Sequence, residues 1–176
     1  MAISPSSSPA PQVWLLPDGG PRARAEPWLA HWQAQGHAVL EQHDWQRPLR
    51  GDWSARLQET LVDARGPVVL VASGLGCILT AWWAAHSPAA AKVRGALLIA
   101  PTDVEDPALR EQLPGWSPIA LKTLPFPCLV VGRTPPADCS LERAQALAQA
   151  WGAAFVALDD PAPNAGAALL QTLLKD

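Results

Sequence analysis

Short aliphatic runs recur along the chain, and most are bounded by glycine, proline or acidic residues. Near-continuous runs of this kind are typical of parallel strands that are covered on both faces. We expect six strands, at Val13–Leu16, Ala38–Leu40, Pro67–Ala72, Gly95–Ala100, Cys128–Val131 and Phe155–Leu158.

The segments between these runs carry apolar residues every three or four positions, which predicts helices that bury one face. Asp52 is expected to cap one helix, and Ser140 to cap another that Gly152 ends. The expected helices are Glu26–Gln35, Asp52–Ala64, Cys77–His86, Ser140–Trp151 and Gly166–Leu174. Alternation of strands and helices predicts an α/β fold, a three-layer α/β/α sandwich around a mainly parallel sheet.

Composition narrows the class of protein. A chain of 176 residues is long enough for one domain, which we expect over residues 13–176 after a disordered lead over residues 1–12. The net charge is −3 and the basic residues are scattered, which argues against nucleic acid as a partner. No apolar run is long enough to cross a membrane, and the lead lacks the charged and apolar regions of a signal peptide.

The cysteines indicate the compartment in which the protein works. Cys77, Cys128 and Cys139 are too few and too irregularly spaced for a disulfide framework or a zinc site. We therefore expect a cytoplasmic protein with free thiols and no cofactor.

One stretch has the layout of a catalytic turn. In VLVASGLGCILTAWW, Val69–Trp83, a buried strand passes through small residues into a helix. This is the arrangement of a nucleophile elbow, in which Gly-x-Ser-x-Gly places a serine on a tight strand-to-helix turn. Ala72 and Gly76 match the flanking small residues, but Gly74 stands where the nucleophile belongs.

The histidines also lie in the wrong part of the chain for a hydrolase of this type. The order along an α/β-hydrolase is nucleophile, acid, histidine. All four histidines, at positions 31, 37, 43 and 86, precede the fifth expected strand. Without an imidazole to accept its proton, a serine hydroxyl is a poor nucleophile. Asp18, after the first strand, would in addition repel a developing oxyanion.

Six blocks of sequence resemble the small serine hydrolases of the YdeN and retinoblastoma-binding-protein-nine type, which have the α/β-hydrolase fold. The resemblance covers about Val13 to Ala165. The blocks are HDWQRPLRGDW (His43–Trp53), VLVASGLGC (Val69–Cys77), GALLIAPTDVEDP (Gly95–Pro107), LPFPCLVV (Leu124–Val131), DCSLERA (Asp138–Ala144) and WGAAFVAL (Trp151–Leu158).

This resemblance implies that all three catalytic positions are vacant. Gly74 holds the place of the family's serine, Pro136 that of its aspartate and Ala162 that of its histidine. The implied protein is a pseudoenzyme that acts by binding a protein partner, a second copy of itself or a small ligand in the vestigial cleft. A variant that has lost its triad and gained no other role is a further alternative.

Two sets of residues are candidates for such binding. A ligand in the cleft would meet Asp18, Ser73, Gly74, Arg133 and Asn164. A partner would meet Trp82 and Trp83, because exposed tryptophan is common at binding hot spots. Adjacent helical residues point about 100° apart. We therefore expect one of these two to be buried and the other partly exposed near the old active site.

An alternative function is a hydrolase or esterase with residual activity through a non-standard nucleophile such as Ser73. That residue lies one position before the elbow. Because a shift of one residue along a strand turns a side chain to the opposite face of the sheet, the Ser73 side chain is expected to point away from the face that a residue at position 74 would use.

Overall fold

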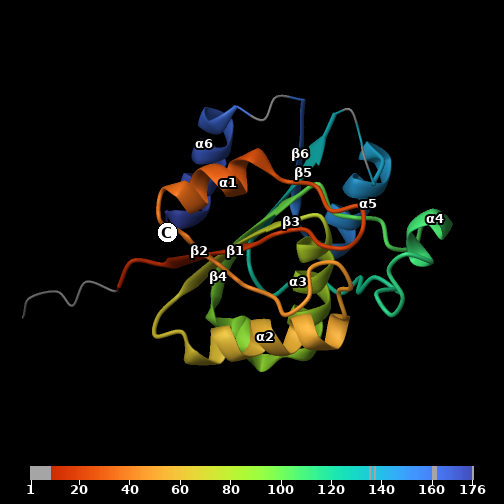
Figure 1. The fold of residues 1–176 in the computed structure, drawn as a ribbon. Coiled ribbons are helices and arrows are strands. Elements are labelled where there is room, and N and C mark those ends of the chain that lie inside the picture. The colour runs from red at the N-terminus through yellow and green to blue at the C-terminus, as the bar shows by residue number, and fades with distance from the viewer. Residues whose placement is uncertain (1–8, 135, 137, 160–161, 176) are drawn as a thin grey trace, which may run out of the picture.

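A six-stranded sheet, parallel throughout, forms the centre of the computed structural model, which describes residues 9–134, 136, 138–159 and 162–175. Its strand order is β2-β1-β3-β4-β5-β6 (Figure 1). The strands are β1 (Gln12–Leu16), β2 (Ala38–Val39), β3 (Val68–Ser73), β4 (Val93–Ile99), β5 (Cys128–Arg133) and β6 (Ala154–Leu158).

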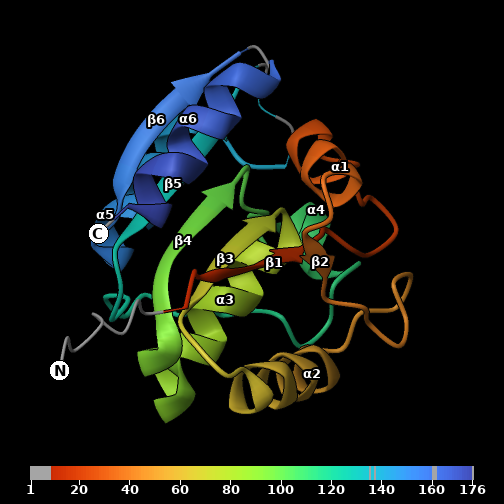
Figure 2. The ribbon, with the colours of Figure 1, turned by 90° about the vertical axis from the view of Figure 1, so that its left-hand side faces the viewer.

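Helices cover both faces of this sheet. They are α1 (Pro27–Ala34), α2 (Arg50–Asp63), α3 (Leu75–His86), the short 3-10 helix η1 (Pro88–Lys92), α4 (Pro107–Arg110), α5 (Leu141–Trp151) and α6 (Pro163–Leu174). Helices α1 and α6 pack on one face, while α2, α3 and α5 pack on the other. Figure 2 shows β1 and β3 lying between α1 on one side and α2 and α3 on the other. The three-layer α/β/α prediction is confirmed.

The strands alternate their side chains between two buried cores, which explains their near-continuous apolar sequence. Val69 and Val71 of β3 join the core under α1 and α6. Leu70 and Ala72 of the same strand join the core under α2, α3 and α5. The β3 strand is buried along its whole length, as expected for a parallel strand covered on both sides.

All six expected strands are present, but three helix starts differ from the prediction. The α3 helix begins at Leu75, two residues before the expected Cys77. The α2 helix begins at Arg50, so Asp52 lies in its first turn and is not the N-cap; Leu49 holds the cap position and its side chain makes no capping hydrogen bond. The α6 helix begins at Pro163, three residues before the expected start, because proline suits the first helical turn. Ser140 and Gly152 end α5 as predicted.

The expected disordered lead over residues 1–12 stays a prediction, because residues 1–8 lie outside the described residues; β1 begins at Gln12. Among the described residues, no helix combines the length and apolar character needed to cross a membrane.

Candidate functional site

A cavity of about 210 Å³ lies beyond the carboxyl ends of the central strands. In open parallel sheets this edge is where ligands bind. The cavity is lined by the last residues of β3 and β5, by the loops that follow β1, β3, β4 and β5, and by one residue of α5. The lining residues are Asp18, Arg24, Ala25, Glu26, Ser73, Gly74, Ala100, Pro101, Thr102, Gly132, Arg133, Asp138, Cys139 and Ala144.

Gly74 forms the tight turn between β3 and α3. Its backbone has φ 54° and ψ −119°, a conformation that side-chain-bearing residues rarely adopt. The Gly74 amide donates to the Ile99 carbonyl at 3.0 Å, and its own carbonyl accepts from Cys77 at 3.1 Å. This is the geometry of a nucleophile elbow, and glycine holds it without the strain that a serine would bear.

The carboxylate of Asp18 occupies the space beside this turn. Its Oδ1 accepts hydrogen bonds from the amides of Leu75 at 2.7 Å and Gly19 at 2.9 Å, and its Oδ2 accepts from Arg24 at 3.1 Å. In α/β-hydrolases the amide of the residue after the nucleophile donates to the oxyanion. Leu75 is that residue, so the Asp18 carboxylate occupies the place where an oxyanion would bind. Its negative charge would also repel an oxyanion.

Asp18 and Gly74 depend on each other sterically. A Cβ atom built on Gly74 would lie 2.2 Å from Asp18 Cγ and 2.4 Å from its Oδ1. Such separations are far below a van der Waals contact. No side chain fits at position 74 while Asp18 keeps its place.

Burial raises the pKa of the Asp18 carboxyl, although hydrogen bonds from the Leu75, Arg24 and Gly19 amides partly oppose this, and the charge of Asp138 adds to the rise. Within the described part of the chain, no basic side chain forms an ion pair with Asp18. The carboxylate is held by backbone dipoles instead.

A partly buried ion pair also lines the cavity. Arg133, the last residue of β5, contacts Glu26 at 2.6 Å and lies over the Trp28 ring with its guanidinium carbon 4.1 Å from the ring centroid. The Trp28 Nε1 donates to the Ala162 carbonyl at 3.2 Å. Arg133 therefore lines the cavity as predicted, but its charge is neutralised. The sequence analysis missed the role of Glu26, which lies on an element remote in the chain from Arg133.

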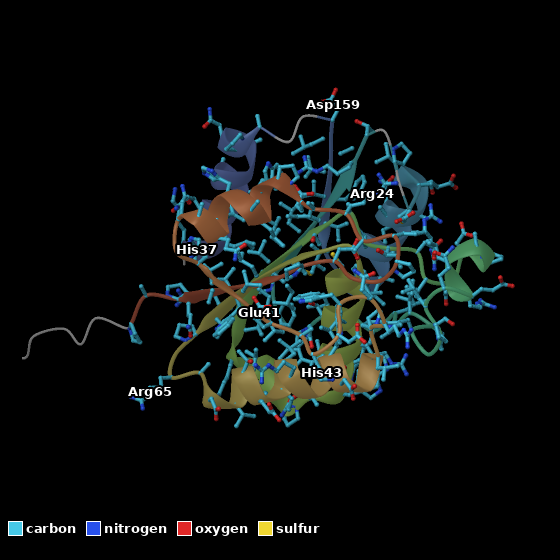
Figure 3. The ribbon with its side chains drawn as sticks, viewed as in Figure 1. Arg24, His37, Glu41, His43, Arg65 and Asp159 are labelled. Atoms are coloured by element: carbon cyan, nitrogen blue, oxygen red, sulfur yellow. The ribbon has the colours of Figure 1, made fainter. Side chains whose placement is uncertain are left out.

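The positions that the resemblance assigns to the acid and the base carry no ionisable side chain. Pro136 is exposed in the loop after β5, and Ala162 is the N-cap of α6. None of the described residues that line the cavity is histidine. Figure 3 shows His37 and His43 away from Arg24, which lines the cavity.

Asn164, the fifth ligand-binding candidate, is not brought together with the other four, and its role in binding stays a prediction. It lies in the first turn of α6, is exposed, and is absent from the described lining of the cavity. The physical reason is the early start of α6, which carries this residue away from the loop that would face the cleft.

Ser73, the alternative nucleophile, and Cys139, a thiol in the cavity lining, have no histidine among the described lining residues to activate them. Ser73 ends β3, is only 4% exposed, and its Oγ has no hydrogen-bond partner in the described structure. Burial raises the pKa of the Cys139 thiol to about 12, with the Asp103 charge adding to the effect. Cys139 is thus a neutral thiol at physiological pH, and a neutral thiol is a weak nucleophile.

The paired tryptophans differ in exposure, as predicted, but lie elsewhere than expected. Trp83 is 2% exposed and its Nε1 donates to Gln58 at 2.8 Å. Trp82 is half-buried, with its ring centroid 4.2 Å from that of His86 and 4.6 Å from the Arg50 guanidinium carbon.

The expectation that they lie near the old active site is wrong. Helix α3 runs away from the cleft, so at about 1.5 Å per residue Trp82 is roughly 10 Å further along the axis than the elbow. Both tryptophans line a separate shallow groove between α2 and α3, and the described residues of that groove include none that line the cavity.

A parallel sheet with an elbow at the end of its third strand defines the class of α/β-hydrolase folds. Residues 15–163 match the family model described as serine hydrolase, and the chain belongs to this family. No curated protein matches it.

Solved structures share the fold. One, from Pectobacterium atrosepticum and assigned as a YdeN-like hydrolase, is 19% identical with a TM-score of 0.70, covering 93% of this chain and 88% of that one. The ydeN gene product of Bacillus subtilis is 17% identical with a TM-score of 0.70, covering 94% of this chain and all of that one (100%).

Proposed function

We propose that this member of the serine hydrolase family is a pseudoenzyme that binds a ligand in its cleft and does not hydrolyse it. The observation that carries the proposal is the elbow itself, where Gly74 supplies no nucleophile and Asp18 fills the adjoining space.

The chemistry of acyl transfer explains why this matters. A serine hydrolase needs a nucleophilic hydroxyl, an imidazole that takes its proton and donors that stabilise the oxyanion. Gly74 removes the first, the absence of histidine from the described lining removes the second, and the bond from Leu75 to Asp18 removes the third. Members of a triad act as a unit, so no single remaining group supports the reaction.

The cavity favours a small molecule as the bound partner. Its volume of about 210 Å³ and its mixed lining of Asp18, Ser73, Arg133 and small apolar residues suit a compact polar ligand. A protein partner or a second copy at Trp82 and Trp83 stays a prediction. It is less favoured, because Trp83 is buried and the Trp82 ring already contacts Arg50 and His86. We place this role in the cytoplasm, because all three cysteines are free thiols.

Fluorophosphonate labelling of the folded protein tests the absence of a nucleophile. At high excess of the reagent, the intact mass is expected to stay unchanged. A stoichiometric adduct would contradict the proposal, and peptide mapping would name the residue. The Ser73→Ala variant is the matched control, because an adduct lost in this variant would establish the alternative hydrolase.

Ligand binding is tested separately. Heteronuclear NMR of the protein with a library of compounds small enough for the cavity is expected to move the amides of Gly132 and Ala100. Hits that move only groove residues such as Ala55 and Ser87 would instead support the surface at Trp82.

A further inference from the structure

The charged side chains in and beside the cavity form pairs, with two exceptions. Four of them form two ion pairs, which are Glu26 with Arg133 at 2.6 Å and Arg22 with Asp138 at 3.0 Å. Asp18 and Arg24 also line the cavity, but neither side chain forms an ion pair with another described residue. One carboxylate and one guanidinium are therefore available to a ligand that carries one charge of each sign.

The Asp18 carboxylate keeps room for one more hydrogen bond. Its two oxygens together can accept about four. Backbone amides supply three, those of Leu75 and Gly19 at Oδ1 and that of Arg24 at Oδ2. Burial raises the pKa of this carboxyl, and the nearby charge of Asp138 adds to the rise. A positive group at Oδ2 would stabilise the ionised form, which burial disfavours.

Ser73 points to a ligand at the same place, independently of the charges. The residue is 4% exposed, its Oγ has no hydrogen-bond partner in the described structure, and it lines the cavity. Ser73, Asp18 and Arg24 also line a neighbouring hollow of about 270 Å³ beside α1, so these three residues surround one space. A buried hydroxyl without a partner costs free energy that a hydrogen bond to a bound ligand would recover.

We propose that the cavity binds a small amino-acid zwitterion, whose ammonium group donates to Asp18 Oδ2 and Ser73 Oγ and whose carboxylate contacts the Arg24 guanidinium. The inference rests on the proposed function, since it names the class of ligand for the same cavity. An ammonium group carries three donors, enough for both acceptors. Arg24 would repel a simple cation and Asp18 would repel a simple anion, whereas a zwitterion is attracted at both ends.

The experiment follows the amide NMR signals of Ser73, Ala100 and Gly132 while the folded protein is titrated with glycine, β-alanine and 4-aminobutyrate. Ethylamine and propionate are matched controls for β-alanine, because each lacks one of its two charged groups. Both are added at the same pH and ionic strength. The best amino acid is expected to shift the signals saturably, with a Kd of about 1 mM. Ethylamine should bind about threefold more weakly than β-alanine, and propionate at least about tenfold more weakly.

Two variants separate the two ends of the ligand. Ser73→Ala removes one hydroxyl and should weaken β-alanine and ethylamine alike, by about fivefold. Arg24→Gln changes an exposed residue and should weaken β-alanine about threefold without weakening ethylamine. Arg47→Gln is the matched control, because Arg47 is also exposed and is absent from the described lining of the cavity. It should alter neither affinity.

The outcomes distinguish this inference from the proposed function. If propionate or an uncharged compound moves the cavity signals and the amino acids do not, the inference is overturned and the proposed function stands. If no compound moves them, both are overturned. An affinity for β-alanine that is the same in wild type, S73A and R24Q also overturns the inference. Should S73A unfold, R24Q decides alone, because its substitution is at an exposed position.

Discussion

Introducing serine at the elbow should destabilise this protein without giving it hydrolase activity. In Gly74→Ser, the new Cβ would lie 2.2 Å from Asp18 Cγ. Forcing an extra group into a packed site costs about 1–3 kcal/mol. A side chain at φ 54° adds about 1–3 kcal/mol of backbone strain. We therefore expect G74S to lose about 2–6 kcal/mol of unfolding free energy.

The two contributions separate in a double-mutant cycle. In the Asp18→Gly background the overlap disappears and only the backbone strain remains, so the same substitution should cost about 1–3 kcal/mol. Urea unfolding of the wild type, both single variants and the double variant measures the coupling. An equal cost of G74S in both backgrounds would refute the steric dependence of Gly74 on Asp18. Neither serine variant is expected to react with a fluorophosphonate, because no histidine is among the described residues that line the cavity.

Three other predictions concern charges in and around the cavity. Arg133→Met leaves the largely buried Glu26 carboxylate without its partner and should lower the free energy of unfolding in urea by about 3 kcal/mol. Most of this loss should be recovered in the double variant with Glu26→Gln. An unchanged free energy of unfolding in R133M would show that the pair is not coupled. Because burial raises the folded-state pKa of Asp18 above its unfolded value of 3.8, its stabilising contribution is complete below that pH and is lost as the pH rises through the folded-state pKa. The free energy of unfolding of Asp18→Asn should therefore increase relative to that of the wild type as the pH rises from 4. Urea unfolding of both proteins across this pH range measures the difference, and a difference that falls with pH would contradict burial as the cause of the raised pKa. Cys139, with a pKa of about 12, should alkylate slowly with iodoacetamide at neutral pH and faster as the pH rises, and rapid labelling at neutral pH would show an activated thiol.

The fold was predictable because its signals are local. Each strand is a short aliphatic run, which is the typical sequence of a parallel strand covered on both faces. Gly74 could be placed at the turn for the same reason, since the strand, the small residues and the helix are contiguous. The helix starts at Arg50 and Pro163 were harder, because a first turn needs no distinctive residue when packing holds the helix in place.

The site was predictable only where chain order sufficed. That no histidine follows β5 can be read directly from the sequence, and the place of Asp18 at the end of the sheet follows from its position after β1. The mutual dependence of Asp18 and Gly74 needed coordinates, because the two residues lie on different elements. The same holds for the pair of Glu26 with Arg133, which are 107 positions apart. The position of Asn164 relative to the cleft depends on the start of α6, because an extra turn of helix changes which residues face a cleft.

The contact of Trp28 with the end of the chain bears on how the molecule unfolds. A Cβ on Gly166 would lie 2.6 Å from the Trp28 ring, so α6 sits directly against the indole, whose other contacts reach Arg133 and Ala162. Strand β6 lies at the edge of the sheet, and edge strands and terminal helices are usually the first parts of a domain to open. Here α6 packs against the Trp28 indole, which also contacts Arg133 at the cavity. Local opening of the C-terminal segment and loosening of the cleft wall should therefore be one cooperative event, and amide hydrogens in α6 and at the end of β5 should exchange at matching rates.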